Sequence, residues 1–232
     1  PVNAGPIGNV LTYQVTGLAP GDNVTITITP TGGAGACYTS ANATCIAIAC
    51  TPPTAGISYA GPFCADVTAP QPVTLTGTGT FTGGTYSAPV GLTINAATGA
   101  ITPGTSTPGT YTVTYTIAAS GGCPAVIATV PVTINPLPAP VITGPTPVCV
   151  SATGTTSTYT TANAAGHTYN WTVTGGTIAT GQGTNTITVT WTTTGTGSVS
   201  VRQTITATGC SGNNTLSVTV NPKPVTTPIT HN

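Results

Sequence analysis

Charged side chains are almost absent from this sequence. The 232 residues include two acidic and two basic ones, so charged residues make up 2% of the chain and the formal net charge is zero. An ordinary domain carries about a quarter charged residues. A phosphate-binding surface needs clustered Lys and Arg, and Arg202 and Lys223 are alone, so a nucleic-acid partner is not expected.

Long apolar runs are also absent. No stretch approaches the roughly 18 apolar residues that a membrane-spanning helix requires, so no membrane span is predicted. The chain starts at Pro1 and shows no signal peptide. We therefore expect it to be a processed product or an excerpt from a longer polypeptide.

The sequence is poor in groups that support catalysis. A Ser-His-Asp arrangement needs a carboxylate to orient the imidazole, and a glycosidase needs two carboxylates in one site. The two carboxylates, Asp22 and Asp66, lie in different parts of the chain, and His167 has none near it in sequence. We predict no catalytic residues and no cofactor, so the protein is not expected to be an enzyme.

A metal site is not predicted either. Calcium needs several carboxylate or carbonyl oxygens, and the two Asp residues are isolated. No cysteine pair has the Cys-x-x-Cys spacing of a zinc site.

What the sequence has in abundance is Thr, Val and Ile, with 30 Gly and 22 Pro between them. These residues favour strands and turns. Apolar residues alternate with polar ones in most segments, as expected for strands with one buried face. Trp171 and Trp191 fall on such faces and are interpreted as core residues. The fold class predicted is all-β, with immunoglobulin-like β-sandwich modules.

Pro-rich segments at 50–56, 134–145 and 220–232 divide the chain. Two of them contain a strand that runs into Asn-Pro-x-Pro, a pattern that stiffens a linker. We predict a partial module at 1–54, a module at 55–137, a module at 138–223, and a linker or donor-strand tail at 224–232. Because 1–54 is too short for a whole sandwich, a strand from a neighbouring copy could complete it, with the tail as the donor.

Seven cysteines with long gaps between them indicate disulfides in an oxidising compartment. The module boundaries suggest two pairs, Cys64 with Cys123 and Cys149 with Cys210. Nearer the N-terminus, Cys37 pairs with Cys45 or, alternatively, with Cys50. The remaining thiol is then free and buried or linked to another chain.

Four Asn residues stand in the N-glycosylation pattern. They are Asn23, Asn42, Asn170 and Asn213. Glycosylation at Thr or Ser is an equal alternative in a chain so rich in threonine.

Three phrases in the last module, "GPTPVCV", "HTYNWTVTGGTIATGQGTNTITVTW" and "TGCSGNNTLSVTVNPKP", resemble PKD-like repeats of very large bacterial cell-surface proteins. The module before it, from "GPFC" to "GGC", resembles the Ig-like repeats found beside them. The resemblance covers about 55–223. It implies surface display, export by the type IX route as in gliding adhesins, and no catalytic residues.

The function predicted is therefore structural: a subunit or segment of an extracellular filament or stalk on the cell surface. Its expected partners are other copies of itself or neighbouring modules of a longer chain. The alternative is an adhesin that binds glycans or other surfaces through loops at the ends of the sandwiches.

Overall fold

The computed structural model describes residues 22–28, 41–46, 51–120 and 123–224. Within these ranges the chain is built of strands, with a short 3-10 turn at Pro103–Thr105. No helix in this part of the chain is long and apolar enough to cross a membrane. The all-β prediction is confirmed.

The strands of the central part form two sheets. Polar and apolar residues alternate along them, so each strand has one face in the core. We call this part, β3 to β8, the central module. The larger sheet has the order β4-β8-β7-β6, and β3 pairs with β5 in the smaller one. The strands are β3 (Thr54–Ser58), β4 (Phe63–Cys64), β5 (Thr74–Thr78), β6 (Thr85–Ser87), β7 (Gly109–Ile117) and β8 (Val126–Asn135).

The core of the central module lies between these sheets. Val113 and Tyr115 of β7 face it together with Val132 and Ile134 of β8, and all four are buried. The Tyr115 hydroxyl donates to the Phe81 carbonyl at 2.8 Å and accepts from the Gly84 amide at 2.8 Å. Its polar end is thus satisfied where its ring is buried.

The C-terminal module, β9 to β15, has the same two-layer plan. One sheet has the order β11-β14-β15-β9 and the other the order β10-β13-β12. The strands are β9 (Val148–Val150), β10 (Thr155–Thr160), β11 (His167–Thr174), β12 (Gly176–Thr180), β13 (Thr186–Trp191), β14 (Gly195–Ile205) and β15 (Ser211–Pro222).

Both tryptophans lie in the core of the C-terminal module, as predicted. Trp171 is 1% exposed and Trp191 is fully buried. The Trp171 indole N–H donates to the Thr184 carbonyl at 2.8 Å. Tyr159 packs edge-on against Trp191, with ring centroids 6.1 Å apart.

Gln182 covers the outer edge of β11, which is an edge strand of its sheet. The side-chain oxygen of Gln182 accepts from the Trp171 amide at 2.9 Å, and its nitrogen donates to the Trp171 carbonyl at 2.9 Å. One side chain therefore occupies both outward backbone groups of Trp171. Unpaired edge groups are a template for pairing with another chain, so Gln182 acts as a local block.

Replacing Gln182 by alanine is expected to lower the stability of the C-terminal module by about 1 kcal/mol, since two hydrogen bonds are lost. It should also increase concentration-dependent self-association through β11. Urea unfolding followed by tryptophan fluorescence and sedimentation velocity measure the two effects. Thr172→Ala is the matched control, because Thr172 is an exposed residue of the same strand and its truncation leaves the Gln182 hydrogen bonds in place. Equal stability and equal self-association of the two variants would contradict the role of Gln182 as a block at the edge of β11.

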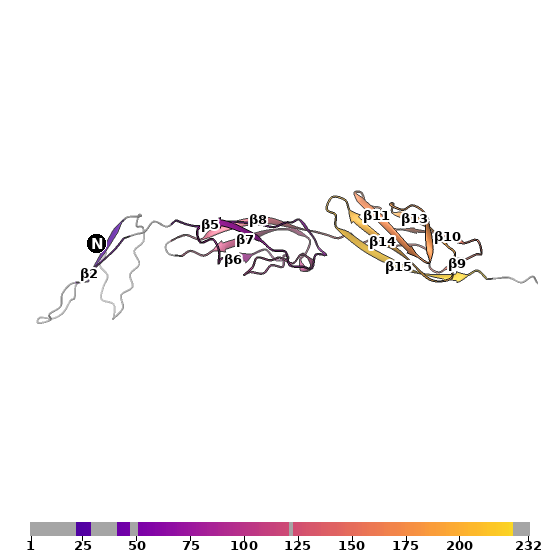
Figure 1. The fold of residues 1–232 in the computed structure, drawn as a ribbon, viewed down its shortest axis with the longest axis horizontal. Helices are drawn as coiled ribbons and strands as arrows, with labels where there is room; N and C mark the ends of the chain where they lie inside the picture. Colours follow the sequence, from indigo (N-terminus) through magenta and orange to yellow (C-terminus); the bar gives the residue numbers. More distant parts are fainter. Residues whose placement is uncertain (1–21, 29–40, 47–50, 121–122, 225–232) are drawn as a thin grey trace, which may run out of the picture.

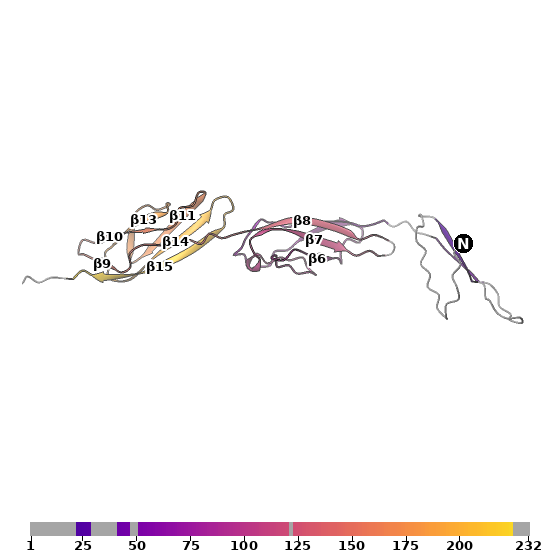
Figure 2. The same ribbon diagram turned by 180° about the vertical axis from the view of Figure 1, so that it is seen from behind.

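The two modules lie end to end, and β1 (Asn23–Ile28) and β2 (Ala41–Ile46) lie beyond the central module at the opposite end from the C-terminal one (Figures 1 and 2). β1 and β2 form an antiparallel pair. Most of the predicted partial module 1–54 and residues 225–232 of the predicted tail lie outside the described residues. The module boundaries given above stay predictions.

The two modules share a topology in their larger sheets. In each, the last two strands form an antiparallel pair, β7 with β8 and β14 with β15. A short strand then pairs in parallel with the end of the last strand: β4 with β8, and β9 with β15. The order β4-β8-β7-β6 thus corresponds to the order β9-β15-β14-β11.

Candidate functional site

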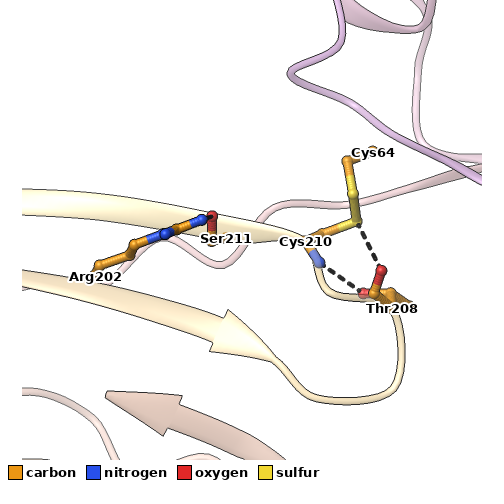
Figure 3. The surroundings of a disulfide bond; sticks show 5 residues. All are labelled: Cys64, Arg202, Thr208, Cys210 and Ser211. Atoms are coloured by element: carbon orange, nitrogen blue, oxygen red, sulfur yellow. Dashed lines mark hydrogen bonds between the residues drawn. A yellow bond between two sulfur atoms is a disulfide. The ribbon is translucent and has the colours of Figure 1, made fainter. Parts of the chain in front are cut away.

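The joint between the two modules is the most distinctive site in the described part of the chain. Two covalent connections cross it. One is the backbone from β8 to β9, which contains Pro136, Pro138 and Pro140. The other is a disulfide between Cys64 and Cys210, whose Cα atoms lie 5.5 Å apart (Figure 3).

Cys64 is placed at the joint by the central sheet. It lies in β4, opposite Asn135, the last residue of β8. The Ala65 amide donates to the Asn135 carbonyl at 3.0 Å. Cys64 therefore lies beside the point where the chain leaves the central module.

Cys210 is placed at the joint by the turn between β14 and β15. The Ile205 amide donates to the Cys210 carbonyl at 2.9 Å, and the Gly209 amide donates to the Ile205 carbonyl at 2.8 Å. Gly209 has a φ of 73°, a conformation that favours glycine. Cys210 is 1% exposed, so the disulfide is buried on this side.

The neighbours of Cys210 are polar. The Thr208 hydroxyl accepts from the Cys210 amide at 3.3 Å, and Arg202 donates to the Ser211 hydroxyl through Nε at 3.1 Å and through one terminal nitrogen at 2.9 Å (Figure 3). Gly212 packs against the backbone that connects β8 to β9, and a Cβ at this position would collide with the Pro138 carbonyl oxygen. The backbone between β8 and β9 is therefore in close contact with the start of β15.

A shallow cleft opens beside the joint. Most of its lining comes from the central module, and two residues come from the turn of the C-terminal module. The lining residues are Tyr59, Gly61, Pro62, Pro131, Val132, Thr133, Asn135, Ala207 and Thr208.

Tyr59 is anchored at this cleft. Its hydroxyl donates to the Gly99 carbonyl at 2.6 Å. Burial, with a smaller contribution from Tyr86, raises the pKa of Tyr59 to about 12 from its ordinary value of 10.0. The folded state thus holds the phenol proton more tightly than the unfolded chain does.

This shift predicts a loss of stability in alkali. The stabilisation from Tyr59 should be complete below pH 10 and should be lost as the pH rises towards about 12. A shift of this size corresponds to at most about 2.7 kcal/mol, and partial exposure reduces it to about 1 kcal/mol. Urea unfolding of the central module, followed by tyrosine fluorescence, should therefore show a shallower decline above pH 10 for Tyr59→Phe. An unchanged slope would contradict the assignment.

The disulfide pairs predicted from the sequence are wrong. Cys64 bonds Cys210 rather than Cys123, and Cys149 is an exposed free thiol. Cys123 is disulfide-bonded as well, and its partner is not Cys64. The predicted pairing of Cys37 with Cys45 or Cys50 lies outside the described residues.

Strand length explains the error. Cys64 lies at one end of β8, whereas Cys123 precedes its other end, and β8 has 10 residues. A strand rises about 3.3 Å per residue, so these ends lie roughly 30 Å apart. Cysteines whose Cα atoms are more than about 7 Å apart cannot form a disulfide. The same argument separates Cys149 from Cys210, which lie at opposite ends of the 12-residue strand β15.

The other candidate residues lie apart. His167 begins β11, where its Nδ1 lies 2.8 Å from Nε2 of Gln203, and its side chain is half-buried. Asp22 and Asp66 are exposed. No group of three or more His, Cys, Asp or Glu residues that could hold a metal ion occurs among the described residues.

The sequon residues lie on strands. Asn23, Asn170 and Asn213 are exposed on β1, β11 and β15, and the side chain of Asn42 lies outside the described residues. The Asn170 side-chain oxygen accepts from Gln182 at 3.3 Å. Glycosylation at these positions stays a prediction.

Sequence reasoning missed the joint as a site. The alternation of polar and apolar residues locates each strand within one module, but it carries no signal for which module ends meet. The one available signal was that Cys64 and Cys149 each stand in a short strand after a proline, Pro62 and Pro147.

The comparisons with known proteins give one family match and a set of similar solved structures. The family model of the PKD-like domain matches residues 135–220. No curated protein matches the chain. Among solved structures, fibronectin(III)-like modules of CbhA from Clostridium thermocellum are 13% identical, with 76% of this chain and 100% of that chain covered and a TM-score of 0.32.

Two bacterial proteins are also similar. The adhesin FdeC of Escherichia coli is 18% identical, with 78% of this chain and 68% of that chain covered and a TM-score of 0.37. Invasin, a bacterial integrin-binding protein, is 17% identical, with 87% of this chain and 46% of that chain covered and a TM-score of 0.30. The chain is an all-β protein with immunoglobulin-like modules, and its residues 135–220 are similar to the PKD-like domain.

Proposed function

We propose that this chain is a non-catalytic structural segment of an extracellular stalk or filament, in which modules are held end to end. The observation that carries this proposal is the Cys64–Cys210 disulfide across the joint. A single backbone connection lets two modules pivot, whereas two separated covalent connections restrict bending and separation. Such a joint suits a protein that must keep its length.

The same bond supports an extracellular location. Disulfides form and persist in oxidising surroundings such as the cell surface. The near absence of charge supports assembly, because proteins with a net charge near zero tend to associate. Export by the type IX route, as the family resemblance implies, belongs to this proposal.

Electron microscopy of the native material tests the proposal, with antibodies against the C-terminal module as the label. Labelled filaments or stalks with a regular axial repeat on the cell surface are the expected result. Antibody labelling confined to the cell interior would overturn it. The strand-exchange form, with 224–232 donated to 1–54, would show as copies cross-linked between these two segments, and a population of monomers alone would remove that form.

The second candidate is an adhesin that binds glycans. The feature that favours it is the cleft at the joint, which presents Tyr59 beside Asn135 and Thr208. The tryptophans do not favour it, because Trp171 and Trp191 are buried and cannot stack on a sugar. Glycan-array binding that is lost in Thr208→Arg, with folding unchanged, would support this candidate; an array without binding would remove it.

A further inference from the structure

Cys149 occupies the same place in the C-terminal module that Cys64 occupies in the central one. Cys64 lies in β4 opposite Asn135, and Cys149 lies in β9 opposite Asn221. Both short strands pair in parallel with the end of the last strand of their module. Each of the opposing Asn residues begins an Asn-Pro-x-Pro phrase, at 135–138 and at 221–224. We call Cys64 and Cys149 the strand cysteines.

A second correspondence concerns the turn between the last two strands. Cys123 lies between β7 and β8, and Cys210 lies between β14 and β15. We call these the hairpin cysteines. At the joint, the strand cysteine of the earlier module bonds the hairpin cysteine of the later one. Cys123, the hairpin cysteine of the central module, is disulfide-bonded too, although Cys64 is already taken.

Cys149 is therefore the one described member of this set with a free thiol. Its neighbours Val148 and Val150 are buried, which holds the strand and turns the Cys149 side chain outward. Cys64 indicates a role for this thiol. It occupies the equivalent register in the central module, and it forms a disulfide across a joint.

We propose that Cys149 is a cross-linking site for a further immunoglobulin-like module, seated at the Asn221 end of the C-terminal module, and that it bonds the hairpin cysteine of that module. The inference deepens the proposed stalk or filament and rests on it. The disulfide of the joint would repeat, so that Cys149 fastens the further module as Cys64 fastens the C-terminal one.

The bond forms by oxidation of two thiols. The S–H bonds of Cys149 and of the partner cysteine break and one sulfur–sulfur bond forms, which releases two protons and two electrons. The two electrons and the two protons convert one external disulfide, that of oxidised glutathione or of the active site of a thiol oxidase, to two thiols.

The first test uses the native protein isolated with free thiols blocked. Peptide mapping without reduction should find the Cys149 peptide joined to a hairpin peptide of an immunoglobulin-like module. If that module belongs to the same polypeptide, reduction leaves the molecular mass of the chain unchanged; if it belongs to a second copy, the mass falls. A free Cys149, or a Cys149 joined to glutathione alone, would overturn the proposal.

The second test extends the chain so that Asn221 is followed by a second copy of residues 136–232. Refolding in a glutathione redox buffer and iodoacetamide labelling then locate the free thiol. In the unextended chain Cys149 is labelled. In the extended chain the first Cys149 should lose its label to a bond with the appended Cys210, and the label should move to the appended Cys149.

The matched control is Cys149→Ser in the first copy of the extended chain, which should leave the appended Cys210 labelled. Labelling of both the first Cys149 and the appended Cys210 without this substitution would contradict the proposal. These outcomes are independent of the microscopy, so a free Cys149 on a labelled filament removes only this inference. A bonded Cys149 in a protein found only inside the cell removes only the proposed function.

Discussion

Replacing Trp171 by alanine is expected to destabilise the C-terminal module by about 3–5 kcal/mol, the usual cost of truncating a buried tryptophan. Trp171 is 1% exposed, and its indole N–H donates to the Thr184 carbonyl at 2.8 Å. The alanine variant leaves a cavity and also leaves that carbonyl without its partner. Because a typical domain is stable by only about 5–15 kcal/mol, the loss would leave the module marginal.

Urea unfolding followed by fluorescence measures this effect in one module. Both tryptophans belong to the C-terminal module, so Trp191 still reports on it when Trp171 is replaced. Val141→Ala is the control, because Val141 is 65% exposed and its truncation should change stability by less than about 0.5 kcal/mol. Trp171→Phe should fall between the two. A Trp171→Ala midpoint equal to that of the control would contradict the core assignment.

Removing the disulfide at the joint is expected to change the shape of the molecule more than its secondary structure. In Cys64→Ser/Cys210→Ser, the backbone between β8 and β9 is the one covalent connection left between the two modules. The modules should then sample bent arrangements that the native protein excludes. Small-angle X-ray scattering should show a broader distribution of interatomic distances, with circular dichroism unchanged.

The same double variant should also be less stable. The disulfide closes a sequence separation of 146 residues, and the chain-entropy model assigns such a loop up to about 5 kcal/mol. Cys149→Ser is the matched control, since it removes an exposed thiol without breaking a bond. Identical scattering curves for the double variant and this control would show that the disulfide does not restrain the joint.

The sequence by itself determined the fold class and the interior of each module. Alternation along 169–173 and 187–191 predicted the buried faces that carry Trp171 and Trp191, because side chains on a strand point to opposite sides in turn. The lack of charge likewise predicted a protein without a basic surface or a catalytic carboxylate pair. These properties follow from local pattern and composition, which a sequence states directly.

The disulfide connectivity was decided only by the tertiary structure. The sequence placed Cys64 and Cys123 in one predicted module, and pairing within a module was the simplest interpretation. A strand of 10 residues keeps these two cysteines at opposite ends of the sheet, while end-to-end stacking brings Cys64 to the turn that carries Cys210 (Figure 3). Which cysteines bond depends on which module ends meet, and that contact joins residues far apart in the chain without leaving a periodic signal in it.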